Sequence, residues 1–210
     1  MNNLLNIDID KFEIVFFEKP QGDNYGEVRN PELEEPITIR LDKTCSNDTK
    51  LLHMEFINGS EEHIKDLKER IKKTNLSNEG RCFLETIMTA LSYRIIFVNH
   101  ISLMKLMNNE IDALCALYHE LGHMVYYDES QHNNEGKRKC LIEEGFVSAD
   151  ELLADEYSYM KFGDNVCETL EKQIEIAKEL NDESKDILIK EYELRLKHLK
   201  EKYSKCTTTL

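Results

Sequence analysis

Residues 119–123 read His119-Glu120-Leu121-Gly122-His123, and this stretch is the most informative part of the chain. On an α-helix, residues four positions apart lie on one face, so the imidazoles of His119 and His123 would point toward the same place. Two imidazoles one turn apart are a common pair of zinc ligands, and Glu120 between them would act on a water molecule held by the metal. These residues therefore predict a zinc-binding helix, with His119 and His123 as ligands and Glu120 as catalytic base.

The residues before the motif favour a long amphipathic helix. Residues 109–118 contain neither proline nor glycine. Apolar side chains recur there at helical spacing, at Ile111, Leu114, Cys115 and Tyr118. Cys115 would share the face of His119, where a small buried apolar side chain is more common than a thiolate ligand. The motif is therefore expected on a helix with one apolar face.

A catalytic zinc site usually has three protein ligands, so a third is expected downstream of the motif. Ser148 is a good N-cap and Glu151 stands three residues later, which is the capping-box arrangement at a helix start. Glu151 and Asp155 would share one face of that helix. We predict that Glu151 is the third ligand and that Asp155 accepts the second ring N–H of a ligating histidine. The competing ligands are Glu144, which ranks next, Glu143 and Glu156.

The pattern His119-Glu120-x-x-His123 followed by Glu151-x-x-x-Asp155 resembles the gluzincin metallopeptidases. The order of a strand, a leucine-rich helix and an acidic helix before the motif is similar to the heat-shock and prenyl-endopeptidase branch. The ImmA/IrrE-type peptidases, which cleave repressors of mobile elements, share the HELGH sequence and a later glutamate. The resemblance covers residues 94–163 and implies zinc-dependent hydrolysis of a protein or peptide substrate.

Composition and charge narrow the expected partners and location. The formal net charge of −14 argues against binding to nucleic acid or to anionic membrane surfaces. No apolar run is long enough to span a bilayer, which departs from the usually membrane-embedded heat-shock branch. The first ten residues lack the features of a signal peptide, and the six cysteines form no C-x-x-C pair. We therefore expect a cytoplasmic protein with reduced thiols.

The segments around the motif predict an α+β fold, in which a small, mostly N-terminal β-sheet accompanies a helical, zincin-like core. Strands are expected at residues 11–18, 37–41, 53–57 and 94–98, with a loop at 20–26. Helices are expected at 60–73, from 77 and from 101 onward, with a break at 128–147. The predicted metallopeptidase domain spans 1–163, with strands within 1–60 and zinc-binding helices within 101–163.

Residues 164–210 predict a C-terminal helical hairpin with a turn at 181–184. Apolar side chains repeat at helical spacing before the turn at Leu170, Ile174, Ala177 and Leu180, and after it at Leu188, Tyr192, Leu196, Leu199 and Tyr203. The simpler interpretation is that this hairpin packs on the catalytic core. The alternative is a surface for a partner or for a homo-oligomer. His198 is expected at the surface.

Two other functions compete with a general zinc peptidase. One is a narrow regulatory protease that cleaves a single cytosolic, repressor-like partner, as the ImmA/IrrE resemblance implies. The other is a non-catalytic, peptidase-like binding module, against which the intact Glu120 argues. The sequence leaves the donor for the oxyanion open among Tyr126, Tyr127, Tyr157 and Tyr159.

Overall fold

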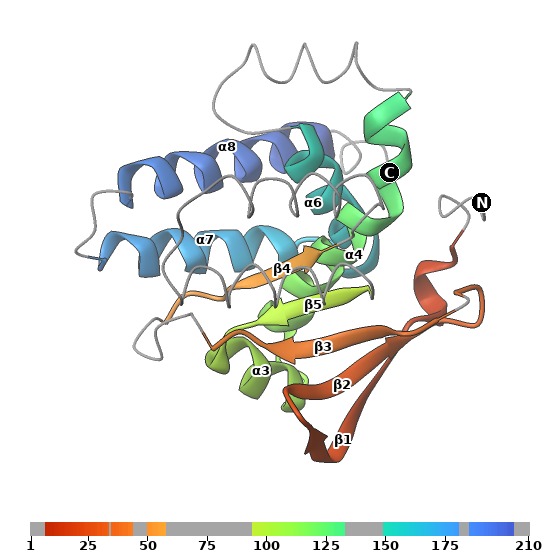
Figure 1. The fold of residues 1–210 in the computed structure, drawn as a ribbon. Coiled ribbons are helices and arrows are strands. Elements are labelled where there is room, and N and C mark those ends of the chain that lie inside the picture. Colours follow the sequence, from red (N-terminus) through yellow and green to blue (C-terminus); the bar gives the residue numbers. More distant parts are fainter. Residues whose placement is uncertain are drawn as a thin grey trace, which may run out of the picture. The chain divides into compact units, whose positions relative to one another are not determined.

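The chain folds as α+β, as predicted (Figure 1). The computed structural model describes residues 7–33, 35–43, 50–57, 94–132, 149–180 and 185–203. The helices expected at 60–73 and from 77, the N-cap Ser148, and the alternative ligands Glu143 and Glu144 lie outside the described residues. Contacts within the chain define a sheet unit of Lys11–Asp42 and Glu55–Val98, and a helical unit of Met1–Asp10, Lys43–Met54 and Asn99–Leu210.

Five strands of the described residues form one sheet in the order β1-β2-β3-β5-β4. The strands are β1 (Glu13–Gln21), β2 (Asn24–Arg29), β3 (Ile37–Leu41), β4 (Met54–Ile57) and β5 (Ile95–Val98). Strands β1 to β3 pair in antiparallel fashion, whereas β3 and β5 are parallel. All four residues of β5 are buried, as expected for a continuous apolar run inside a sheet.

The prediction of a loop at residues 20–26 is wrong, because β1 and β2 form a hairpin there. Only Gly22 and Asp23 make the turn, and Gly22 has a φ of 65°, which suits a tight hairpin turn. Pro20 lies where the β1–β2 register shifts, on an edge strand, which is where a sheet tolerates proline. A Cβ on Gly26 would lie 2.6 Å from the Val15 carbonyl oxygen, so this glycine allows close pairing of the strands.

The described residues contain five α-helices, all in the helical unit. They are α3 (His100–Met107), α4 (Ile111–His132), α6 (Ala149–Phe162), α7 (Asn165–Lys178) and α8 (Lys185–Tyr203). The Asn99 side chain caps α3 by accepting a hydrogen bond from the Ser102 N–H. The break predicted from residue 128 begins too early, because α4 continues to His132. Polar residues alone do not end a helix, and no glycine or proline occurs between Gly122 and Gly136.

The predicted C-terminal hairpin is present as α7 and α8, which lie side by side (Figure 1). Their shared core includes Cys115 from α4, so the hairpin packs on the helix that carries the histidine motif. The buried members of this core are Cys115, Val166, Cys167, Leu170 and Leu199. Cys115 is thus a buried apolar side chain, as expected, and burial raises the pKa of its thiol to about 11.

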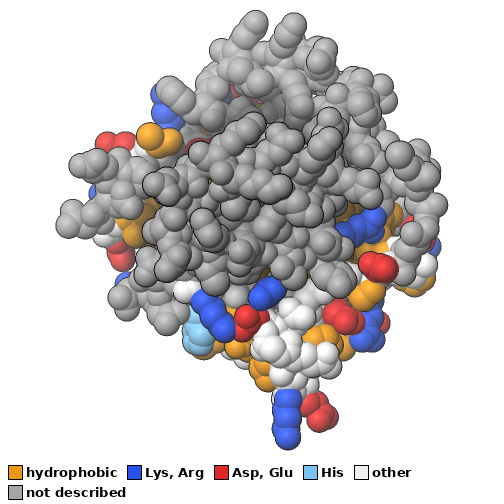
Figure 2. Space-filling model, in the orientation of Figure 1, with side chains coloured by type: hydrophobic (Ala, Val, Ile, Leu, Met, Phe, Trp, Pro, Cys, Tyr) orange, Lys and Arg blue, Asp and Glu red, His pale blue; other side chains and the backbone are white. Residues whose placement is uncertain are grey.

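The described charged side chains on the face shown in Figure 2 are of both signs. Acidic and basic side chains are interspersed over the described part of that face. Within the residues described, none of the helices has the length and apolar character to cross a lipid bilayer.

Candidate metal centre

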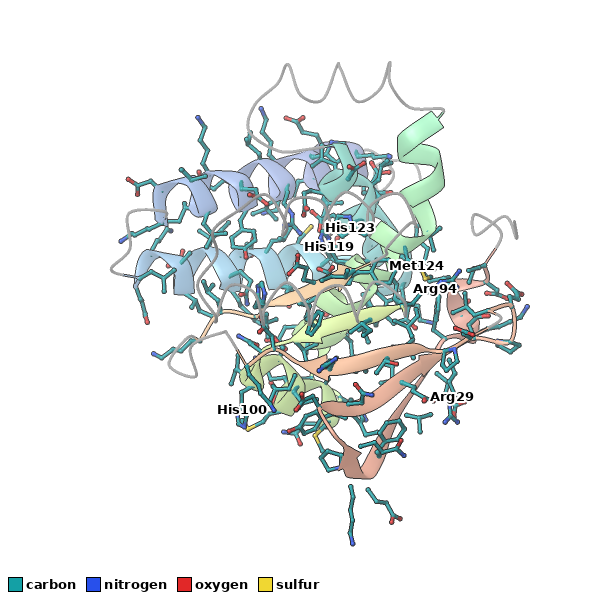
Figure 3. All side chains as sticks on the ribbon, in the orientation of Figure 1. Arg29, Arg94, His100, His119, His123 and Met124 are labelled. Atoms are coloured by element: carbon teal, nitrogen blue, oxygen red, sulfur yellow. The ribbon has the colours of Figure 1, made fainter. Side chains whose placement is uncertain are left out.

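Helix α4 brings the two histidines of the motif together. They stand one turn apart and project from the same side of α4 (Figure 3). The Nε2 atoms of His119 and His123 are 3.1 Å apart, and the two rings meet edge to face at 89°. His119 is buried, with 8% exposure, whereas His123 remains half-buried. The shared face expected from the four-residue spacing is therefore present.

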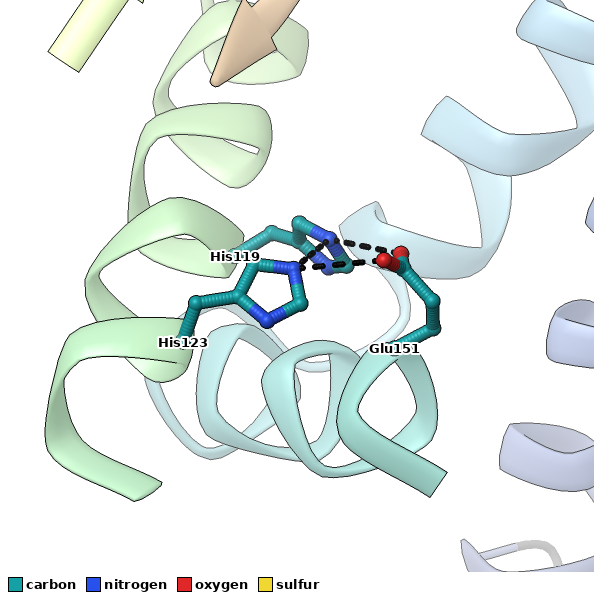
Figure 4. Close-up of side chains that lie close together, drawn as sticks. All are labelled: His119, His123 and Glu151. Atoms are coloured by element: carbon teal, nitrogen blue, oxygen red, sulfur yellow. Dashed lines mark hydrogen bonds and ion pairs between the residues drawn. The ribbon is translucent and has the colours of Figure 1, made fainter. Parts of the chain in front are cut away.

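Glu151, in the first turn of α6, completes a cluster of three possible metal ligands (Figure 4). Its Oε2 atom lies 3.1 Å from His119 Nε2, and its Oε1 atom lies 3.4 Å from His123 Nε2. One donor atom from each of the three residues falls within 4.8 Å of the others. The structure thus brings together the three residues predicted as ligands, two from α4 and one from α6.

The spacing and chemistry of these donors fit a zinc ion. With bonds of about 2.0–2.2 Å, the ligand atoms of a tetrahedral zinc site stand roughly 3.4 Å apart. The separations of 3.1, 3.1 and 3.4 Å come close to that value. Imidazole nitrogen and carboxylate oxygen are both ordinary zinc donors. The partial exposure of His123 and Glu151 leaves the cluster reachable from solvent.

Asp155 holds the ring of His119 from the other side. Its Oδ1 atom is 2.7 Å from His119 Nδ1, and the contact is buried. Because an ionised carboxylate can only accept, Nδ1 must carry the proton and donate it to Asp155. The Nε2 atom of His119 then faces His123 and Glu151, which is the orientation that a metal ligand needs. The contact expected between Asp155 and one of the histidines is therefore present.

Arg195 on α8 also belongs to this cluster, and it was not predicted from the sequence. Its Nε and Nη2 atoms donate to the two carboxylate oxygens of Asp155, each at 2.7 Å. Its Nη1 atom is 3.2 Å from Glu151 Oε2. A signal was available, because Arg195 stands three residues after Tyr192 and four before Leu199, on the predicted apolar stripe. A charged residue on a buried stripe implies a buried partner of opposite charge.

These neighbours shift one another's pKa values. Burial favours the neutral carboxyl of Glu151, but hydrogen bonds with His119 and His123 hold its pKa far below the usual range. Burial acts in the same way on Asp155, yet the Arg195 guanidinium and His119 lower its pKa to about 2. Burial and Arg195 oppose protonation of His119, whereas Asp155 and Glu151 raise its pKa to about 9. Both carboxylates are therefore ionised at neutral pH.

Glu156, one of the alternative ligands, belongs to a separate cluster. Its Oε1 atom is 2.8 Å from His198 Nε2 and 2.5 Å from Lys202 Nζ, both on α8. One step along a helix turns a side chain by about 100°, so Glu156 faces away from the side shared by Glu151 and Asp155. The side chain of His198, which was expected at the surface, is 25% exposed, and its ring pairs with Glu156.

Three other residues predicted from the sequence, Glu120, Tyr157 and Tyr159, lie on α4 and α6. Glu120 is 8% exposed on α4, directly after His119. Tyr157 is buried on α6. The Tyr159 hydroxyl donates to Asp164 at 2.8 Å and its ring stacks on Tyr203, so Tyr159 is engaged in the helical packing. The side chains of Tyr126 and Tyr127 lie outside the described part of the chain.

Gly122, inside the histidine motif, sets how closely α4 approaches α6. A Cβ at this position would lie 2.7 Å from the Ala154 Cα and 3.0 Å from the Ala154 carbonyl oxygen. Both are backbone atoms, so a side chain here would force the helices apart. Ala154 stands between Glu151 and Asp155 on α6. The missing side chain of Gly122 therefore allows the carboxylates to reach the histidines.

We expect Gly122→Ala to lower the free energy of unfolding by about 1–3 kcal/mol, the usual cost of overpacking. Alanine is the better helix former, so any net loss must come from the contact with α6. Metal affinity should fall as well, because Glu151 would move away from His119. Urea denaturation and zinc titration measure the two effects.

Gly163→Ala is the control for Gly122→Ala. The φ of 56° at Gly163 predicts strain, but a Cβ there would meet no neighbouring atom, so metal affinity should be unchanged. Unchanged stability in Gly122→Ala would contradict this role.

Comparisons of the chain with protein-family models, with curated proteins and with solved structures found no match.

Proposed function

We propose that this protein is a zinc-dependent metallopeptidase that hydrolyses peptide bonds in a protein or peptide substrate. The convergence of His119, His123 and Glu151 carries the proposal. Structural zinc sites use four protein ligands, whereas catalytic sites use three and keep one position open. Among the residues that the structure describes, the cluster has three members and no fourth. Its composition therefore favours a catalytic metal over a structural one.

Each residue of the centre has a distinct part in this proposal. His119, His123 and Glu151 would hold the zinc ion. When bound, zinc lowers the pKa of a water molecule and polarises a peptide carbonyl group. Glu120, which directly follows His119, would take up the proton of the attacking water and deliver it to the leaving amine. Asp155 keeps the proton of His119 on Nδ1, so that Nε2 remains available as a ligand.

Glu120→Gln is expected to lower the rate of peptide hydrolysis by about 10²–10⁴-fold, the usual contribution of a general base. Its zinc content should match that of the wild type, because Glu120 is not one of the ligands. A peptide library of random sequence, read by mass spectrometry, measures cleavage, and elemental mass spectrometry measures zinc. Glu193→Gln, an exposed substitution of the same kind on α8, should leave both quantities unchanged.

Other outcomes of this experiment would favour the competing functions. Cleavage of only a few library sequences would support a narrow regulatory protease. If the zinc-loaded wild type cleaves no peptide, and peptide binding is the same with glutamine at position 120, the peptidase proposal fails and a binding module replaces it. Equal activity of the wild type and Glu120→Gln would refute the role of Glu120.

A further inference from the structure

We propose that Arg195 is a positioning residue of the metal centre, and that α8 is therefore part of this centre. The inference rests on the proposed zinc site, because it concerns how that site is held together. Arg195 contacts Asp155 and Glu151 but belongs to a helix that supplies none of the three ligands. The role of Arg195 would be to orient the ligands His119 and Glu151.

The guanidinium joins two carboxylates that stand one turn apart on α6. It grips Asp155 through both oxygens, each at 2.7 Å, and reaches Glu151 Oε2 at 3.2 Å. A planar, two-pronged contact of this kind restricts both the position and the rotation of a carboxylate. Lysine, with a single ammonium group, cannot reproduce it.

Each contact acts on a different metal ligand. Asp155 Oδ1 accepts from Arg195 Nη2 and from His119 Nδ1, both at 2.7 Å. Arg195 therefore holds the oxygen that orients the His119 ring. On Glu151, the contact with Arg195 is made by Oε2, while Oε1 faces His123. One side chain of α8 thus constrains His119 through Asp155, and Glu151 directly.

Burial and charge favour a cation at this place. Asp155 is 1% exposed and Arg195 is 8% exposed, so water offsets little of either charge. Asp155 and Glu151 both approach His119, and the Arg195 guanidinium places a further positive charge against both carboxylates. Arg195 is itself held by Glu191, at 3.6 Å, and lies over the Tyr192 ring at 5.5 Å. These contacts keep the guanidinium directed at α6.

The same pair of helices offers a matched control. The Glu156–His198–Lys202 cluster also joins α6 to α8 through a partly buried carboxylate, at 2.8 and 2.5 Å. In the described part of the chain, no hydrogen bond or ion pair of this cluster reaches the three ligands or Asp155. A substitution in this cluster therefore weakens the docking of α8 without removing a contact to the metal centre.

The test compares the wild-type chain with Arg195→Gln, Arg195→Lys and Lys202→Met. Cobalt(II) is added to each metal-free protein to record the visible absorption spectrum, which reports coordination geometry. Zinc affinity is measured by competition with a chromogenic chelator, and circular dichroism checks that each variant is folded. Arg195→Gln is expected to lower zinc affinity about 10–100-fold, the usual effect of losing a residue that orients metal ligands, and to alter the cobalt spectrum. Lys202→Met should match the wild type in both.

Arg195→Lys keeps the charge but loses the two-pronged contact, so it should recover part of the affinity with the cobalt spectrum still altered. If Arg195→Gln does not fold, Arg195→Lys alone tests the positioning role. Wild-type affinity and spectrum in the Arg195 variants would overturn the positioning role while leaving the zinc site intact. Equal losses of zinc affinity in Lys202→Met would also overturn the positioning role, because they would show that weaker docking of α8 is enough to cause the effect. A wild type that binds neither cobalt nor zinc would instead refute the proposed function.

Discussion

Protein purified without added metal is expected to carry about one zinc ion per chain, and His123→Ala is expected to carry almost none. His123 supplies one of three donors, and its Nε2 atom lies 3.1 Å from His119 Nε2 and 3.4 Å from Glu151 Oε1. Two donors hold zinc far more weakly than three, so the ion would be lost during purification. Elemental mass spectrometry gives the zinc content directly.

The same measurement decides which glutamate is the third ligand. Glu151→Ala should lose zinc as His123→Ala does, whereas Glu156→Ala should keep it, because Glu156 pairs with His198 and Lys202 instead. Zinc retained by Glu151→Ala but lost by Glu144→Ala would contradict the ligand assignment. If no variant holds zinc, and the folded wild type takes up none when it is added, the proposed metal centre must be abandoned.

Asp155→Leu is expected to lower the free energy of unfolding by about 3–5 kcal/mol. The cost arises because Arg195 would stay buried after losing the carboxylate that accepts two of its hydrogen bonds. Urea denaturation of the metal-free protein measures it without any contribution from zinc binding. The double variant Asp155→Leu/Arg195→Met should recover most of the loss, since apolar side chains often replace a buried ion pair without penalty.

An exposed ion pair provides the comparison for this measurement. Lys200 and Glu171 join α7 and α8 at 2.6 Å, but about half of each side chain is exposed, at 52% and 51%. Glu171→Gln should therefore change the free energy of unfolding by less than about 1 kcal/mol. If Asp155→Leu costs no more than Glu171→Gln, or if the double variant is as unstable as the single one, the buried pair does not have the energetic role assigned to it.

The parts of the centre that could be predicted from the sequence are those determined within one helix. His119 and His123, and likewise Glu151 and Asp155, are four residues apart, so helical periodicity alone places each pair on one face. The meeting of the two pairs depends on packing between α4 and α6. That packing requires Gly122, which the metal-binding motif treats as a variable position.

Features that depend on distant segments were harder to predict. Arg195 reaches Asp155 across 40 residues of sequence, and the helical pattern of α8 does not state which carboxylate it will meet. The β1–β2 hairpin was missed for a related reason. Turn-forming residues between 20 and 26 located the reversal of the chain, but the cross-strand pairing that extends both strands to Gly22 and Asp23 is not a local property.

The position of Arg195 along the chain has a consequence for synthesis. A ribosome that adds ~5–20 residues per second needs roughly 2–8 s to extend the chain from Asp155 to Arg195, a separation of 40 residues. Throughout that interval the nascent chain already contains both histidines and both carboxylates but not the guanidinium between them. Metal captured so early would enter a centre whose acidic groups are not yet held in place. Under the proposed ligand assignment, α8 would complete the centre only after His119, His123 and Glu151 have been synthesised.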